Sequence, residues 1–151
     1  MLSLLAPLVL LVNGLAAGVL LGTLLGGWPL LAALPDDRYV HAHAFFATRY
    51  DPAMPACLLG TLVGDIALAA VTRSGAARGL FLVAALLAVS TIAISLSKNV
   101  PTNKWIQTLD PQHPPADLRD RKRQWGLWNR RRSLLTLLAL LVNCAALAVL
   151  L

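Results

Sequence analysis

Residues 2–31 read LSLLAPLVLLVNGLAAGVLLGTLLGGWPLL, thirty positions in a row without a charged side chain. A helix rises about 1.5 Å per residue, so this stretch exceeds the roughly 30 Å hydrocarbon core of a bilayer. A cleavable signal peptide would have a basic start and a shorter apolar stretch. We therefore interpret residues 2–31 as a permanent membrane-spanning helix, with lipid as its solvent.

Three further apolar stretches follow, and the composition agrees with them. Hydrophobic residues make up 58% of the 151 positions and charged residues 13%, whereas a soluble domain is about half apolar and about a quarter charged. The sequence predicts an all-α fold, an integral membrane four-helix bundle that forms a single transmembrane domain over residues 1–151. An additional interfacial helix or loop region is expected between the third and fourth helices. The predicted helices cover approximately residues 2–31, 38–72 (kinked near 52–55), 79–98 and 129–151.

Basic residues predict the orientation. With four spans, both termini and the turn at 72–78 share one side, and the turn holds two of the 13 Lys and Arg residues. Loops 32–51 and 98–132 hold the other eleven. The positive-inside rule therefore predicts that these two loops are cytoplasmic and that both termini lie outside the cytoplasmic membrane. Such basic loops typically contact anionic lipid, so the net charge of +6 does not predict a nucleic-acid partner.

Small residues predict close helix contacts. Gly14, Gly18, Gly22 and Gly26 recur at every fourth position and share one helix face. In a membrane, such a face lets another helix approach closely, and a homo-oligomer through glycine-rich faces is one way to use it. A second motif of this kind is Gly60 with Gly64.

Asp65 is the one acidic residue that falls deep inside a predicted span. Ionisable groups at membrane depth are costly and are usually paired or functional. The available polar partners inside other spans are Asn13, Thr91 and Asn143. Asp65 lies about 20 Å along the helix from Pro52 and therefore far from the polar loops, which favours a structural role.

Two histidines lie in the predicted helix after the first loop. His41 and His43 are two positions apart, so in a helix they point about 200° apart and cannot bind one ion. In an extended segment they would share a face and could bind copper or zinc. His43 also falls on an aromatic stripe with Tyr39, Phe46 and Tyr50, which makes it the better candidate for a single general base. The alternative is that both histidines only extend toward the headgroups.

Polar residues flank the third loop on both sides. Asn99 and Asn103 share a face if the helix continues past Ser97, and amide, indole and guanidinium donors follow at the entrance of the last span. Such donors suit the binding of a developing oxyanion or a polyphenol. The alternative is an aromatic and basic anchor at the membrane surface. The residues on the far side of the loop are Trp125, Trp128, Asn129 and Arg132.

At these motifs the sequence resembles the DUF1772 family of small four-helix membrane proteins, which includes the anthrone-oxygenase-like proteins of polyketide pathways. The resemblance is carried by Lys98-Asn99-Val100-Pro101-Thr102-Asn103, by Trp125-x-x-Trp128-Asn129 with Arg132, and by Arg49-Tyr50-Asp51-Pro52-Ala53-Met54-Pro55. It implies an oxidoreductase that acts on a lipophilic aromatic, polyketide-type small molecule. A base removes an acidic benzylic proton, and O₂ then oxidises the enolate without an obligatory cofactor.

Under that resemblance, the implied catalytic residues are His43, Asn103 and Arg132. The implied substrate contacts are Tyr50, Asn99, Trp125, Trp128 and Asn129. No cofactor is predicted, although a metal or haem stays an open alternative, with His41 and His43 as the metal ligands. A non-enzymatic membrane scaffold or a small transporter subunit is the other alternative, because the glycine face and basic loop need no chemistry to explain them.

Overall fold

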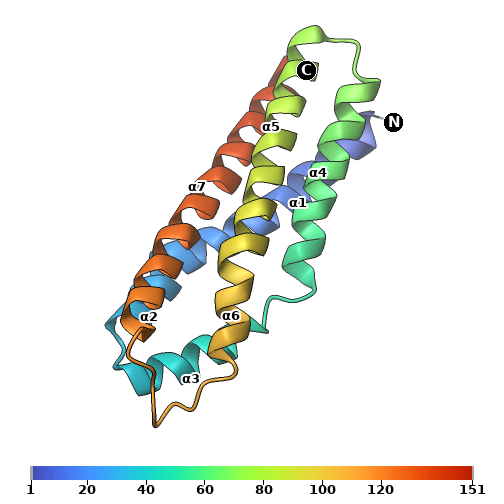
Figure 1. The fold of residues 1–151 in the computed structure, drawn as a ribbon. Helices are drawn as coiled ribbons and strands as arrows, with labels where there is room; N and C mark the ends of the chain where they lie inside the picture. Colours follow the sequence, from blue (N-terminus) through green and yellow to red (C-terminus); the bar gives the residue numbers. More distant parts are fainter. Residues whose placement is uncertain (1, 151) are drawn as a thin grey trace.

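The computed structural model describes residues 2–150 and is an all-helical membrane bundle (Figure 1). Four helical rods are long and apolar enough to cross a membrane. Rods that follow one another in the sequence run antiparallel. An amphipathic helix, α3, comes between the first two rods along the chain. The elements are α1 (Leu2–Gly22), η1 (Thr23–Gly27), α2 (Trp28–Ala33), α3 (Asp36–Ala47), α4 (Ala53–Val71), α5 (Gly75–Ile94), η2 (Ser95–Asn99), α6 (Val100–Ile106) and α7 (Leu118–Leu150).

The rods differ in length. The rods Leu2–Ala33 and Gly75–Ile106 have 32 residues each and α7 has 33, whereas α4 has only 19. At about 1.5 Å per residue, α4 is about 28 Å long and the others are about 20 Å longer. Both chain ends lie at the end of the bundle where α4 turns into α5, and α2, α3 and α6 gather at the opposite end (Figure 1). The extra length therefore lies on the side of α3.

Two segments differ from the sequence prediction. Residues 38–72 form two helices rather than one kinked helix, because α3 ends at Ala47 and α4 begins at Ala53. A residue that precedes proline disfavours helical backbone, and Asp51 precedes Pro52. The predicted loop 98–132 is mostly helix, so only residues 107–117 connect α6 to α7.

Each of the two long composite rods contains a π-helical turn just before a proline. The Trp28 N–H bonds to the Thr23 carbonyl ahead of Pro29, and the Val100 N–H bonds to the Ser95 carbonyl ahead of Pro101. A proline lacks an N–H donor and its ring crowds the preceding turn. A wider turn with one extra residue relieves this crowding, which lets both rods continue beyond their prolines.

The two glycine motifs behave differently. A Cβ atom on Gly64 would collide with the Val9 side chain, and one on Gly60 would lie 3.6 Å from Val12 Cγ2. The predicted close packing of the Gly60–Gly64 motif is therefore confirmed, and its partner is α1. On the stripe that begins at Gly14, an added Cβ would meet nothing within 4 Å at any of the four glycines. Among residues 2–150, therefore, no other helix packs against that stripe.

Asp65 belongs to a polar cluster in the middle of the bundle. Asn143 Nδ2 on α7 donates to Asn13 Oδ1 on α1 at 3.0 Å and to Asp65 Oδ2 on α4 at 3.3 Å. All three side chains are buried. Thr91, the third predicted partner, instead accepts a bond from Thr136 Oγ1 at 3.2 Å. The Asp65 cluster thus links three helices at a point where lipid offers no hydrogen bonds.

Candidate functional site

A cavity of about 540 Å³ lies at the α3 end of the bundle. Its walls come from the last turn of α1, from η1 and α2, from α3, from the first turns of α4, and from η2, α6 and α7. Most of the lining is apolar, and polar groups are concentrated on the α6 and α7 side. A cavity of this size, apolar with a few convergent polar groups, is typical of a small-molecule site.

Four side chains form one hydrogen-bonded network on the polar wall. His43 Nδ1 lies 2.9 Å from the Tyr39 hydroxyl, and His43 Nε2 lies 3.0 Å from Asn103 Oδ1. Trp125 Nε1 donates to the same Asn103 oxygen at 2.8 Å. The His43 ring also packs edge-on against Trp125, with 4.6 Å between the ring centroids. Helices α3, α6 and α7 therefore meet at Asn103.

This network determines the protonation of His43. An indole N–H can only donate, so the Asn103 oxygen must face Trp125. His43 Nε2 faces that same oxygen and therefore carries the ring proton. Neutral imidazole then has its lone pair on Nδ1, which accepts the hydroxyl proton of Tyr39. Asn103 Nδ2 has no protein partner among the hydrogen bonds of residues 2–150 and remains for a ligand.

Burial keeps His43 neutral. Its side chain is 1% exposed, and this burial lowers the pKa of His43 to about 4, against an opposing effect of the Asn103 hydrogen bond. The positive charge of Arg132 lowers it further. Burial raises the pKa of the Tyr39 hydroxyl, so Tyr39 also stays protonated. At neutral pH the network therefore carries no charge of its own, and His43 is the neutral tautomer with its proton on Nε2.

Arg132 places a guanidinium on the cavity wall, which Lys104 also lines. Its Nε and one terminal nitrogen donate to Asn129 Oδ1 at 3.2 and 3.0 Å, and its other terminal nitrogen lies 3.5 Å from Ser95 Oγ. None of the ion pairs within residues 2–150 includes Arg132. A guanidinium held by neutral groups keeps its charge uncompensated, so it can stabilise an anion in the cavity.

Two of the predicted substrate contacts lie behind the cavity wall. Asn99 is buried and donates through Nδ2 to the Trp125 carbonyl oxygen at 3.4 Å. Asn129 is buried and orients Arg132. Neither residue lines the cavity. They position residues that do, because Asn99 bonds to Trp125 and Asn129 bonds to Arg132, both on α7.

Of the other three predicted contacts, Trp125 lines the cavity as part of the network, and Tyr50 and Trp128 differ in position. Tyr50 lines the cavity at its exposed edge, in the linker between α3 and α4. Trp128 does not line it and instead packs beneath Arg131 and Lys98, with 4.4 and 5.3 Å from their cationic groups to the ring centroid. This arrangement matches the interfacial anchor that the sequence left as an alternative for this residue.

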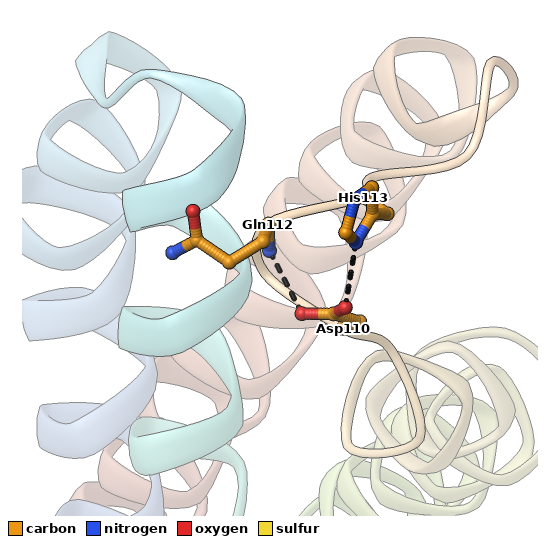
Figure 2. A network of polar contacts seen from close by, with 3 residues as sticks. All are labelled: Asp110, Gln112 and His113. Carbon is orange, nitrogen blue, oxygen red and sulfur yellow. Dashed lines mark hydrogen bonds and ion pairs between the residues drawn. The ribbon is translucent and has the colours of Figure 1, made fainter.

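The remaining histidines lie outside this network. His41 is exposed while His43 is buried, so the two occupy different faces of α3. His113 lies in the exposed loop 107–117, where its Nδ1 donates to Asp110 at 2.8 Å and the Gln112 backbone N–H donates to the same carboxylate at 2.9 Å (Figure 2). Within residues 2–150, no three His, Cys, Asp or Glu side chains gather as a metal-ligand group.

Sequence reasoning missed several residues of the site. Gly22 and Gly26 line the cavity, although their spacing predicted only helix packing. Ser95 contacts Arg132 across 37 positions of sequence, and no local pattern indicates that contact. Tyr39 was placed on the same stripe as His43, but no hydrogen bond between them was predicted. The signal was their spacing of four residues, because side chains four apart in a helix are neighbours.

These features define the chain as a four-helix membrane protein with an apolar cavity that has polar groups at one end. The family model described as anthrone oxygenase matches residues 43–142, about two thirds of the chain. The chain therefore belongs to the anthrone oxygenase family, also called DUF1772, as its motifs predicted. Comparisons with curated proteins and with solved structures gave no match. The matched range includes every polar residue of the cavity network except Tyr39.

Proposed function

We propose that this protein is a membrane oxygenase that converts the acidic methylene of an anthrone-type polycyclic aromatic compound to a ketone. The observation that carries the proposal is Arg132, a guanidinium without an ion pair among residues 2–150, which lines the same apolar cavity as Asn103. The family match supports the general kind of activity. Basic residues on the α3 side support placing this site at the cytoplasmic face.

In this reaction a substrate with a carbonyl group gives one methylene proton to solvent water and becomes an enolate. Arg132 and Asn103 Nδ2 stabilise the enolate oxygen, which lowers the free energy of deprotonation. The methylene carbon then reacts with O₂. Two C–H bonds are replaced by one C=O bond, and O₂ accepts four electrons, so that one oxygen atom enters the ketone and the other leaves as water.

We assign His43 to the positioning of Asn103 rather than to proton abstraction in the resting arrangement. Both ring nitrogens of His43 are engaged, and Nε2 already carries a proton. To act as the base that the family resemblance implied, His43 would have to release the Tyr39 hydroxyl from Nδ1, or lose the proton that Nε2 donates to Asn103. A base with a pKa of about 4 would also be a weak acceptor for a carbon-bound proton.

The test is oxidation of anthrone by the purified protein in lipid nanodiscs under ¹⁸O₂, with heat-denatured protein to measure spontaneous oxidation. We expect one ¹⁸O atom in the quinone product. Arg132→Met should reduce the rate by about 100-fold or more, which is the usual effect of losing an oxyanion donor. Arg131→Met is the matched control, since Arg131 is exposed and packs on Trp128. Equal rates for wild type and Arg132→Met would refute the proposal.

A further inference from the structure

The cavity has an open edge between the first rod and the start of α4. Gly22 and Gly26 of that rod line the cavity and are exposed, and Pro55 and Tyr50 across the gap are also both cavity-lining and exposed. A Cβ atom on either glycine would meet nothing within 4 Å. Residues that both line the cavity and remain exposed mark the place where the cavity opens to its surroundings.

The short α4 explains why this edge is open. Gly64 packs against Val9 and Gly60 against Val12 in an antiparallel register. In this antiparallel pair, each residue back along α4 corresponds to one residue forward along the first rod. Ala53, the first residue of α4, therefore lies level with about residue 20 of that rod. Gly22 and Gly26 therefore lie beyond the end of α4, where the rod Leu2–Ala33 continues without α4 as a neighbour.

The surroundings of the opening are apolar on one side and polar on the other. Leu25 and Leu30, beside the two glycines, are 70% and 55% exposed, as expected for side chains that face acyl chains. Asp51 and Lys104 line the cavity on the loop side and are exposed. The opening thus lies at the boundary between acyl chains and headgroups.

We propose that this opening is a lateral mouth, through which a flat, uncharged polycyclic compound passes from the bilayer into the cavity, and that Gly22 and Gly26 set its width. Two glycines one turn apart expose bare backbone, which offers a flat wall to a planar ring system. The polar groups that would hold the compound's oxygen atoms, Asn103 and Arg132, lie on the α6 and α7 side of the cavity. The inference takes the cavity as the ligand site of the proposed function and does not depend on the oxygenation chemistry.

The experiment measures how fast a lipid-dissolved probe enters the cavity. Anthraquinone is preloaded into phosphatidylcholine vesicles and mixed with protein in vesicles of the same lipid, and its arrival is followed by quenching of tryptophan fluorescence, since Trp125 lines the cavity. Gly22→Leu and Gly26→Leu should slow the association about tenfold or more, because a four-carbon side chain fills the gap. Gly26→Ala should give an intermediate rate, and its small change guards against misfolding of the leucine variants.

Gly14→Leu and Gly18→Leu are the matched controls. They lie on the same stripe, have equally free surroundings and do not line the cavity, so their association rates should stay near wild type. Wild-type rates for folded Gly22→Leu and Gly26→Leu would overturn the proposal. Equal slowing by Gly18→Leu would also overturn it, and would indicate that the whole stripe is a contact between two copies of the chain. Normal probe entry without anthrone oxidation would refute only the proposed function.

Discussion

His43 should make the stability of the protein fall as the solution becomes acidic. Folding lowers the pKa of His43 from its ordinary 6.5 to about 4, chiefly through burial. Between these two values the unfolded chain binds a proton that the folded chain does not, so acid favours unfolding. The stabilisation is present above about pH 6.5 and is lost as the pH falls toward 4.

The size of the effect follows from the two pKa values. Lowering the pH from 7 to 5 should reduce the free energy of unfolding by about 2 kcal/mol through His43 alone. For a chain of this size, such a change corresponds to a fall in Tm of about 4–8 °C. The assay is thermal unfolding in detergent or nanodiscs, followed by circular dichroism at a series of pH values.

The matched variants isolate His43 from other titrating groups. His43→Gln keeps a polar amide in the network but removes the titration, so its unfolding free energy should change between pH 7 and 5 by about 2 kcal/mol less than that of wild type. His41→Gln replaces an exposed histidine of the same helix and is the control substitution. If wild type and His43→Gln lose stability equally between pH 7 and 5, the deduced burial and neutral state of His43 are wrong.

Further substitutions at Gly64, Gly126, Trp125 and Asp65 test the packing and the network. Gly64→Ala should cost about 1–3 kcal/mol in unfolding by denaturant because its Cβ collides with the Val9 side chain, while Gly18→Ala should not destabilise the protein. Gly126→Ala should displace the Trp28 ring that packs on it, which a changed near-ultraviolet circular dichroism spectrum would reveal. Trp125→Phe removes the N–H that orients Asn103, and should weaken binding of anthraquinone in an equilibrium titration without unfolding the protein. Asp65→Leu should cost about 1 kcal/mol or more and Asp65→Asn less, both measured by denaturant unfolding, since the amide preserves a hydrogen bond to Asn143.

The membrane fold was accessible from the sequence because hydrophobic length is a local property. The thirty uncharged residues 2–31 are enough to predict a membrane-spanning helix, without reference to the rest of the chain. The close packing of Gly60 and Gly64 was predicted for the same reason, since small residues at helical spacing mark a face. The helix ends were less accessible. The third helix was predicted to cover approximately residues 79–98, but the π-turn η2 precedes Pro101 and the helical rod continues to Ile106.

The candidate site was accessible only in part. His43, Asn103 and Arg132 were chosen for their chemical types, and the structure brings all three to one cavity. The tautomer of His43 could not be predicted, because it depends on the indole of Trp125, which is 82 positions away in sequence. Trp128 is chemically the same as Trp125, yet it faces outward, since three positions along a helix turn a side chain to another part of the surface.

The sequence by itself determined the solvent, the number of spans and the residue types that can stabilise an anion, since each depends on composition over one or two helical turns. Only the tertiary structure decided that a cavity exists, because it arises where the short α4 ends beside three longer rods. The glycine stripe shows the difference. Its spacing predicted one face for helix packing. Gly22 and Gly26 instead line the cavity and contact no other helix within the part of the chain that the structure describes, because the register of α4 against Val9 and Val12 ends before it reaches them.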